Sequence, residues 1–175
     1  MVSECDWMAR LAHIALTLFL IVTPAELCIA PVAAQSPFDV YELADYRLTP
    51  EVFERFVQAS KRVGDIARQD PAFRFAPLFT KDVALSGDAV VEANGLMARL
   101  VNHPGLSAAL ESAKIPPREY AKFAITLVAA YLANGFMKAG VLQRVPAGAP
   151  TINVEFVKAH EADVTETLEH LGIID

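Results

Sequence analysis

Cysteine is scarce in this chain, and the position of its two cysteines limits the chemistry that most of the sequence can perform. Cys5 and Cys28 are the only two in 175 residues, and none follows position 28. The remainder of the chain is therefore excluded from disulfide bonding, thiolate catalysis and cysteine-ligated zinc or iron–sulfur centres.

Familiar catalytic and nucleotide-binding motifs are also missing. The sequence contains no glycine-rich phosphate loop, no GxSxG elbow, no HExxH, no CxxCH and no dense acidic metal loop. Lys and Arg number 15 against 21 Asp and Glu, which gives a net charge of −6 without a basic cluster. This balance argues against binding to nucleic acid or to an anionic membrane surface.

The N-terminal segment has the layout of a secretory signal peptide. Residues 11–22 (LAHIALTLFLIV) form a mostly apolar core, and Val32 and Ala34 supply small residues at the −3 and −1 positions of a cleavage site. We therefore expect residues 1–34 to be a signal peptide cleaved after Ala34. The protein would then be exported, either to the periplasm or as a secreted product.

An uncleaved N-terminal anchor is the alternative to cleavage. A helix that spans a membrane needs about 20 consecutive apolar residues, and an extension of this run soon meets Pro24 and Glu26. The start codon stays open between Met1 and Met8, because a chain that begins at Met8 has the more usual basic start of a signal peptide.

Removal of the signal peptide leaves 141 residues, a length that suits one domain with its own core. This mature chain has no cysteine, and its 14 basic and 18 acidic residues give a net charge of −4. We expect it to consist of an extended arm over residues 35–48 and a helical domain over residues 49–175.

The helical domain is predicted to be an all-α bundle of four to five helices. Apolar residues recur at three- and four-residue spacing, and no strand-like alternation of any length occurs. Capping and breaking residues set the ends, with Thr49 before Pro50 at the first start and Gly140 and Gly172 at the last two stops. The expected helices cover residues 50–69, about 86–101, 104–113, 117–138 and 153–171.

Aromatic residues mark two segments outside these helices. The aromatic residues of the arm over residues 35–48 indicate that the arm packs along the domain. Phe73, Phe75 and Phe79 lie in an irregular stretch over residues 71–85, and we expect them to cover one end of the bundle.

The helix expected over residues 117–138 is apolar on almost all sides, which is typical of a membrane span or of a central helix surrounded by others. Its apolar stretch is about fifteen residues long and contains Asn134 and Gly135, so it is too short and too polar to span a membrane. We therefore expect a central helix, with Gly135 permitting a close crossing of helices.

His160 is the most informative polar residue of the last expected helix. It shares one face with Phe156, Val164, Leu168 and Leu171, so it interrupts a stripe that should be buried. A buried imidazole without a partner costs about 1–3 kcal/mol. Two interpretations follow: a core histidine bonded to a neighbouring helix, or a pocket histidine that acts as a ligand or a base.

Four residues of the central helix are candidates to line a pocket together with His160, namely Asn134, Tyr131, Tyr120 and Thr126. The alternative is structural, because Thr126 can bond to the carbonyl group four residues earlier and Asn134 can link two helices.

Other ionisable residues have structural explanations. His103 and His170 lie near expected helix C-termini, where the helix dipole favours a histidine. The acidic residues of the last helix are expected to form a solvated face rather than a calcium or zinc site. These are Glu155, Glu161, Asp163, Glu166 and Glu169.

Two classes of function remain. The leading expectation is a non-enzymatic exported binding module for a partner protein or a small apolar ligand, without cofactor or metal. The alternative is an enzyme, or a haem- or metal-binding bundle, that uses a pocket around His160. In a b-type haem site, Met97 or Met137 would supply the second axial ligand. A pocket with converging polar groups at His160 favours the alternative, whereas an exposed apolar patch of several hundred Å² favours a binding module.

Four stretches carry a resemblance to small, exported, all-helical bacterial proteins of unassigned function. They are residues 45–49 (DYRLT), 102–104 (NHP), 117–120 (PREY) and 153–160 (NVEFVKAH), and together they extend over most of positions 45–170. The resemblance implies a helical fold and export, and it assigns a role to no residue.

Overall fold

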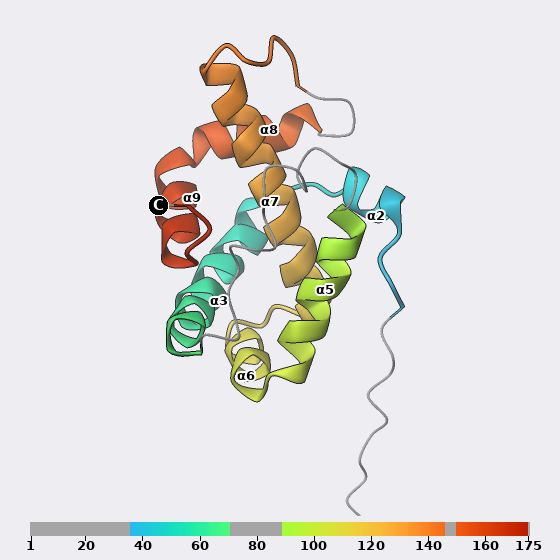
Figure 1. The fold of residues 1–175 in the computed structure, drawn as a ribbon, viewed down its shortest axis with the longest axis vertical. Coiled ribbons are helices and arrows are strands. Elements are labelled where there is room, and N and C mark those ends of the chain that lie inside the picture. The colour runs from blue at the N-terminus through green and yellow to red at the C-terminus, as the bar shows by residue number, and fades with distance from the viewer. Residues whose placement is uncertain (1–35, 71–88, 146–149, 175) are drawn as a thin grey trace, which may run out of the picture. The chain divides into compact units, whose positions relative to one another are not determined.

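The computed structural model describes residues 36–70, 89–145 and 150–174, and all regular structure in these residues is helical (Figure 1). The predicted all-α fold is confirmed. The signal peptide expected over residues 1–34 and the aromatic residues Phe73, Phe75 and Phe79 lie outside the described residues. In chain order the helices are α2 (Val40–Ala44), α3 (Pro50–Gln69), α5 (Ala89–Asn102), α6 (Pro104–Ser112), α7 (Pro117–Lys138), α8 (Thr151–Ala159) and α9 (Glu161–His170).

Helix α7 is the central helix, with the bounds that the sequence predicts. It packs most extensively against α5 and α8 and also contacts α3 and α6. Among the described residues it is the one helix long and apolar enough to cross a membrane, and 61% of its most apolar window is buried within the protein. Such burial by neighbouring helices is typical of a core helix.

Local signals in the sequence set the start of α3. Thr49 Oγ1 accepts a hydrogen bond from the Val52 amide at 3.4 Å, and Pro50 occupies the first helical position. The helix ends at Gln69, with Asp70 as its C-cap. Both boundaries agree with the prediction.

Aromatic rings fill the core between α3 and α7. Phe56 lies 4.7 Å from Tyr120 and 4.9 Å from Phe123 between ring centroids, and Phe53 stacks on Phe123 at 6.1 Å. Each such pair adds about 0.5–1.5 kcal/mol to the effect of burial alone. These contacts fix the register between the two helices.

The prediction of one helix over residues 153–171 is wrong, because the chain breaks at His160 into α8 and α9. His160 has φ −119° and ψ 25°, outside the helical range. Helix α8 packs against α7 whereas α9 packs against α3, so a single straight helix cannot serve both partners. Figure 1 shows the change of direction between them.

The predicted N-cap of the last helix is also wrong. Pro150 precedes the first residue of α8, and Asn153 lies inside the helix with its side chain buried. Its Oδ1 accepts a hydrogen bond from the Leu48 amide at 3.0 Å, and its Nδ2 donates to the Tyr46 carbonyl at 2.9 Å. Asn153 therefore holds the arm against the domain.

The arm packs along the domain as its aromatic residues predict, and one turn of helix, α2, interrupts it. Asp39 caps this turn by accepting a hydrogen bond from the Tyr41 amide at 3.1 Å. Phe38 is buried, and its amide donates to Oδ1 of Asn94 on α5 at 2.9 Å.

Charged groups at the start of α7 complete the docking of the arm. Arg118 donates hydrogen bonds to both carboxylate oxygens of Glu42 and to the Ser36 carbonyl, and its guanidinium carbon lies 4.3 Å from the centroid of the Phe38 ring. Lys122 Nζ is 3.3 Å from Glu42. The hydrogen bond from Arg118 is the main cause that lowers the pKa of Glu42.

Glycine marks a close helix crossing, but at a different position from the predicted one. Gly135 is exposed, and a Cβ built there meets no atom within 4 Å, so the prediction for this residue is wrong. At Gly64 of α3, a Cβ would lie 2.6 Å from Cδ2 and 2.7 Å from the carbonyl oxygen of His170. Gly140 (φ 72°) and Gly172 (φ 66°) follow the ends of α7 and α9, as predicted.

His103 has a structural role of a different kind from the predicted one. It is the N-cap of α6, and its Nδ1 accepts a hydrogen bond from the Leu106 amide at 3.3 Å. Capping of the following helix, rather than the dipole of the preceding one, is the contact that the structure shows.

Candidate ligand-binding groove

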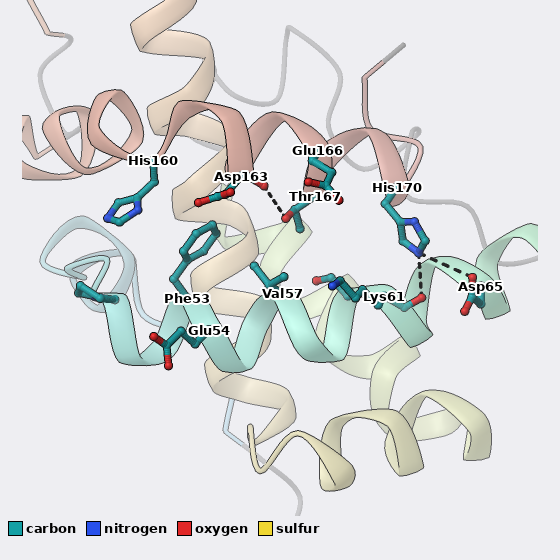
Figure 2. A pocket seen from close by; sticks show the side chains of 12 residues that line it. Phe53, Glu54, Val57, Lys61, Asp65, His160, Asp163, Glu166, Thr167 and His170 are labelled. Carbon is teal, nitrogen blue, oxygen red and sulfur yellow. Dashed lines mark hydrogen bonds and ion pairs between the residues drawn. The ribbon is translucent and has the colours of Figure 1, made fainter.

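A groove of about 820 Å³ lies between α3 and α9, with His160 at one end and His170 at the other (Figure 2). Its volume falls within the range of about 300–1,000 Å³ that small-molecule sites occupy. Both walls are single helices, so the side chains that line it come from one stripe of each helix.

Helical spacing explains which side chains of α3 reach the groove. Phe53, Val57 and Lys61 follow one another at intervals of four residues and therefore share a face. Figure 2 shows Phe53 and Val57 directed toward α9. These two residues give the groove an apolar wall.

Polar contacts hold the two helices together at the His170 end. Nε2 of His170 lies 2.9 Å from the Lys61 carbonyl oxygen and 3.7 Å from Oδ1 of Asp65. The His170 carbonyl accepts a hydrogen bond from Arg68 at 2.8 Å, and Gly64 leaves room for the ring. His170 therefore stabilises the α3–α9 contact, whereas the sequence predicted only a position that the helix dipole favours.

At the other end, His160 is half-buried rather than part of the core. Its ring centroid lies 4.5 Å from that of Phe156 and 5.6 Å from that of Phe53. Within residues 36–70, 89–145 and 150–174 its imidazole makes no hydrogen bond, so the interpretation as a core histidine bonded to a neighbouring helix is wrong. The helix break at this residue places it at the end of the groove instead.

Three carboxylates line the groove without an ion pair or a hydrogen bond to any described residue. They are Glu54 on α3 and Asp163 and Glu166 on α9. Apart from the histidines, Lys61 is the one basic residue among the lining side chains. The groove therefore combines an apolar wall with an excess of negative charge.

The sequence placed Asp163 and Glu166 on a solvated face, and both are indeed exposed. What it missed is that this face borders a groove. Thr167 also lines the groove, and the sequence analysis did not name it; its hydroxyl donates to the Asp163 carbonyl at 2.7 Å. His160, Asp163, Glu166 and His170 follow one another at intervals of three to four residues, so they share one face of the helix. This spacing is the signal in the sequence from which the wall could have been predicted.

Of the five predicted pocket residues, the structure places only His160 in this groove. Tyr120 is fully buried, and this burial raises its pKa. Its hydroxyl lies 2.9 Å from Oγ of Ser60. Thr126 and Asn134 are buried and Tyr131 is half-buried, all on α7. The groove lies between α3 and α9, and α7 therefore contributes none of its lining residues.

Asn134 is exceptional among the buried polar groups. Its Oδ1 is buried without a hydrogen-bond partner among the described residues, so the predicted link between two helices is not formed there. A buried acceptor without a partner costs about 1–3 kcal/mol.

The described residues contain no group of three or more His, Cys, Asp or Glu positioned to hold a metal ion. Met97 is buried on α5 and Met137 is half-buried on α7, and neither lines the groove that contains His160. This groove therefore does not bring together the two axial ligands that a b-type haem would need.

Comparison of the chain with protein-family models, with curated proteins and with solved structures found no match. The groove and its residues are therefore the features that indicate a function.

Proposed function

We propose that the protein is a non-enzymatic binding module that holds a small ligand with an apolar body in the α3–α9 groove. The observation that supports this function is the groove itself, with a volume of about 820 Å³ and a wall formed by Phe53 and Val57. Sites for small molecules are concave and mostly apolar, with a few polar groups that orient the ligand.

The described surface supports a small ligand better than a partner protein. Among the described residues four large apolar side chains are well exposed, one each on α2, α5 and α8 and one in the segment after α7. Isolated exposed apolar residues are normal on a protein surface, whereas interaction sites expose contiguous patches. The four residues are Tyr41, Val91, Val141 and Ile152.

An enzyme that uses His160 is the second candidate, because the groove reaches this residue. General base catalysis by an imidazole needs a group that orients the ring. No described residue bonds to the His160 ring, which favours the binding module. The haem alternative is tested separately: a Soret band in the purified protein would support haem and contradict a cofactor-free module.

We propose that this binding takes place outside the cytoplasm, because residues 1–34 have the layout of a signal peptide. Removal of these residues would retain Ser36, to which Arg118 binds. N-terminal sequencing of the natural product should give Gln35 as the first residue. Retention of residues 11–22 would contradict export by cleavage.

A fluorescence titration tests the binding function. The full chain, expressed in a host that processes exported proteins, is titrated with the neutral apolar dye Nile red. We expect saturable binding of one dye per chain, which Val57→Trp should weaken about tenfold or more by filling the groove. Lys61→Trp is a second blocking variant at an exposed position that is more tolerant of a large side chain.

Val91→Trp is the matched control. It makes the same change on α5 at a residue that is 65% exposed and does not line the groove. The control should bind dye like the natural chain. No saturable binding, or equal binding by natural chain and both blocking variants, would overturn the proposed function.

A further inference from the structure

We infer that the ligand of the α3–α9 groove is a small organic cation, an amine that carries an aliphatic or aromatic body. This inference rests on the proposed binding function and adds to it the charge of the ligand. It follows from the charges that line the groove and from where along the groove they lie.

Three of the four carboxylates that line the groove differ from two neighbouring acidic residues of α8 and α9. Glu155 forms an ion pair with Lys158, and Glu161 forms one with Lys138. Glu54, Asp163 and Glu166 line the groove, and none of them pairs with a described residue. Because they come from both walls, a cation in the groove would have negative charge on two sides.

The distribution of charge gives the ligand a direction. At the His170 end, Asp65 is already paired with Arg68, and Lys61 contributes a second positive charge. At the His160 end, Glu54 and Asp163 have no such partner among the described residues. The ammonium group is therefore expected at the His160 end, with the apolar body along Val57.

The rings at the His160 end also suit a cation. Phe53 and His160 line the groove there, and the Phe53 ring is 5.6 Å from that of His160. The face of an aromatic ring attracts an ammonium group, and the attraction grows as water is excluded. A carboxylate ligand would meet repulsion from Glu54 and Asp163 at the same place.

One of the three carboxylates has a structural explanation as well. Asp163 lies in the first turn of α9, where the helix dipole favours an acidic residue. Glu54 lies in the second turn of α3 and Glu166 in the middle of α9, so the dipole explains neither. Substitutions of Glu54 and Glu166 are therefore the sharper test.

Three probes test the inference: octylammonium, octanol and octanoate. Their aliphatic bodies are alike, and their head groups differ in charge. Each is titrated against the full chain at low salt by displacement of Nile red. We expect octylammonium to bind about tenfold more tightly than octanol, and octanoate to bind most weakly. The preference should decrease as salt is added, because exposed charges are screened.

Variants then assign the preference to the groove. Glu54→Gln and Glu166→Gln should each reduce the advantage of octylammonium over octanol severalfold. Glu169→Gln is the matched control, because Glu169 is exposed on α9 and does not line the groove. It should keep the full preference.

The outcomes separate the two proposals. If all three probes bind equally and Val57→Trp blocks them, the groove binds ligands but the inference of a cation is wrong. If no probe displaces Nile red, the inference of a cation is wrong, and if Nile red itself shows no saturable binding, the binding function fails with it. If the chain dimerises and Val57→Trp dissociates the dimer, a second copy occupies the groove and both proposals are wrong.

Discussion

The side chains that dock the arm are almost all paired, whereas several that line the α3–α9 groove are not. Arg118 binds Glu42 through two hydrogen bonds, and Lys122 lies 3.3 Å from Glu42 and 3.4 Å from Glu119. The Tyr46 hydroxyl donates to Glu119, and burial together with this carboxylate raises the Tyr46 pKa. Every one of these groups stabilises the folded chain.

Apart from the paired groups at its His170 end, the groove has the opposite character. Glu54, Asp163 and Glu166 line it without partners among the described residues, and the His160 ring lies near the rings of Phe53 and Phe156 without a hydrogen bond to a described residue. The difference teaches where to look for function. The side chains that dock the arm, here called the paired face, hold the fold, and the side chains that line the groove, the unpaired face, are where we propose that a ligand binds. Substitutions should separate the two faces by their effect on stability.

Asn153→Ala should show the largest effect. The change leaves the Leu48 amide and the Tyr46 carbonyl without their partner, and we expect a loss of about 2–4 kcal/mol in the free energy of unfolding. Urea denaturation of the natural chain and the variant measures it. Asn102→Ala, at an exposed asparagine on α5, is the control and should stay within about 0.5 kcal/mol. If Asn153→Ala also lowered the free energy of unfolding by no more than the control does, Asn153 would not be the residue that holds the arm.

Gly64→Ala comes next and tests the closed end of the groove. The added Cβ would lie 2.7 Å from the His170 carbonyl oxygen, which is backbone and cannot rotate away. We expect a destabilisation of about 1–3 kcal/mol, because the two helices must move apart. Gly95→Ala on α5 adds the same methyl group where nothing lies within 4 Å. It should stabilise the protein by about 0.5–1 kcal/mol, and equal effects of the two changes would contradict the close approach.

Helix boundaries were predictable where a few neighbouring residues decide them. Thr49 with Pro50 starts α3, Pro117 starts α7, and Gly140 ends it. Capping hydrogen bonds and fixed backbone angles act within one turn, so the sequence alone contains the information. The apolar circumference of α7 likewise predicted a central position.

The break at His160 was not predictable in this way. The residues on both sides are helical, and the break reflects which helices α8 and α9 pack against. Asn153 looked like a cap for the same reason, because its actual partner, the arm, is more than a hundred residues away in the chain. The break at His160 places this residue at the end of the groove. The apolar stripe on the last helix was enough to identify His160 as a pocket residue. It could not show that the other lining residues come from α3 and not from α7.

Acidification should lower the free energy of unfolding through Glu42, by less than Gly64→Ala does. Its pKa is lowered in the folded protein, chiefly by Arg118, so the stabilisation is complete above the ordinary value of 4.5 and is lost as the pH falls through the lowered value. Glu42→Gln should cost about 1 kcal/mol at pH 7 and less at pH 3. Urea denaturation at both pH values measures the difference. In an Arg118→Met background the cost of Glu42→Gln at pH 7 should shrink, with Lys122 as the remaining partner; an unchanged cost would mean that Arg118 is not the cause.

His160→Gln should have the smallest effect on stability, because the unpaired face contributes little to the fold. The ring is half-buried and makes no hydrogen bond to a described residue, so we expect a loss within about 0.5 kcal/mol. His103→Gln is the control, since His103 caps α6, and its loss should cost about 0.5–2 kcal/mol. Thermal and urea unfolding of both variants, alongside Nile red titration, gives stability and binding on the same samples. A loss above 1 kcal/mol at His160 would show that its imidazole has a structural partner. A stable variant that still binds dye but loses a turnover measured in the natural protein would move His160 from the wall of a binding groove to the centre of an active site.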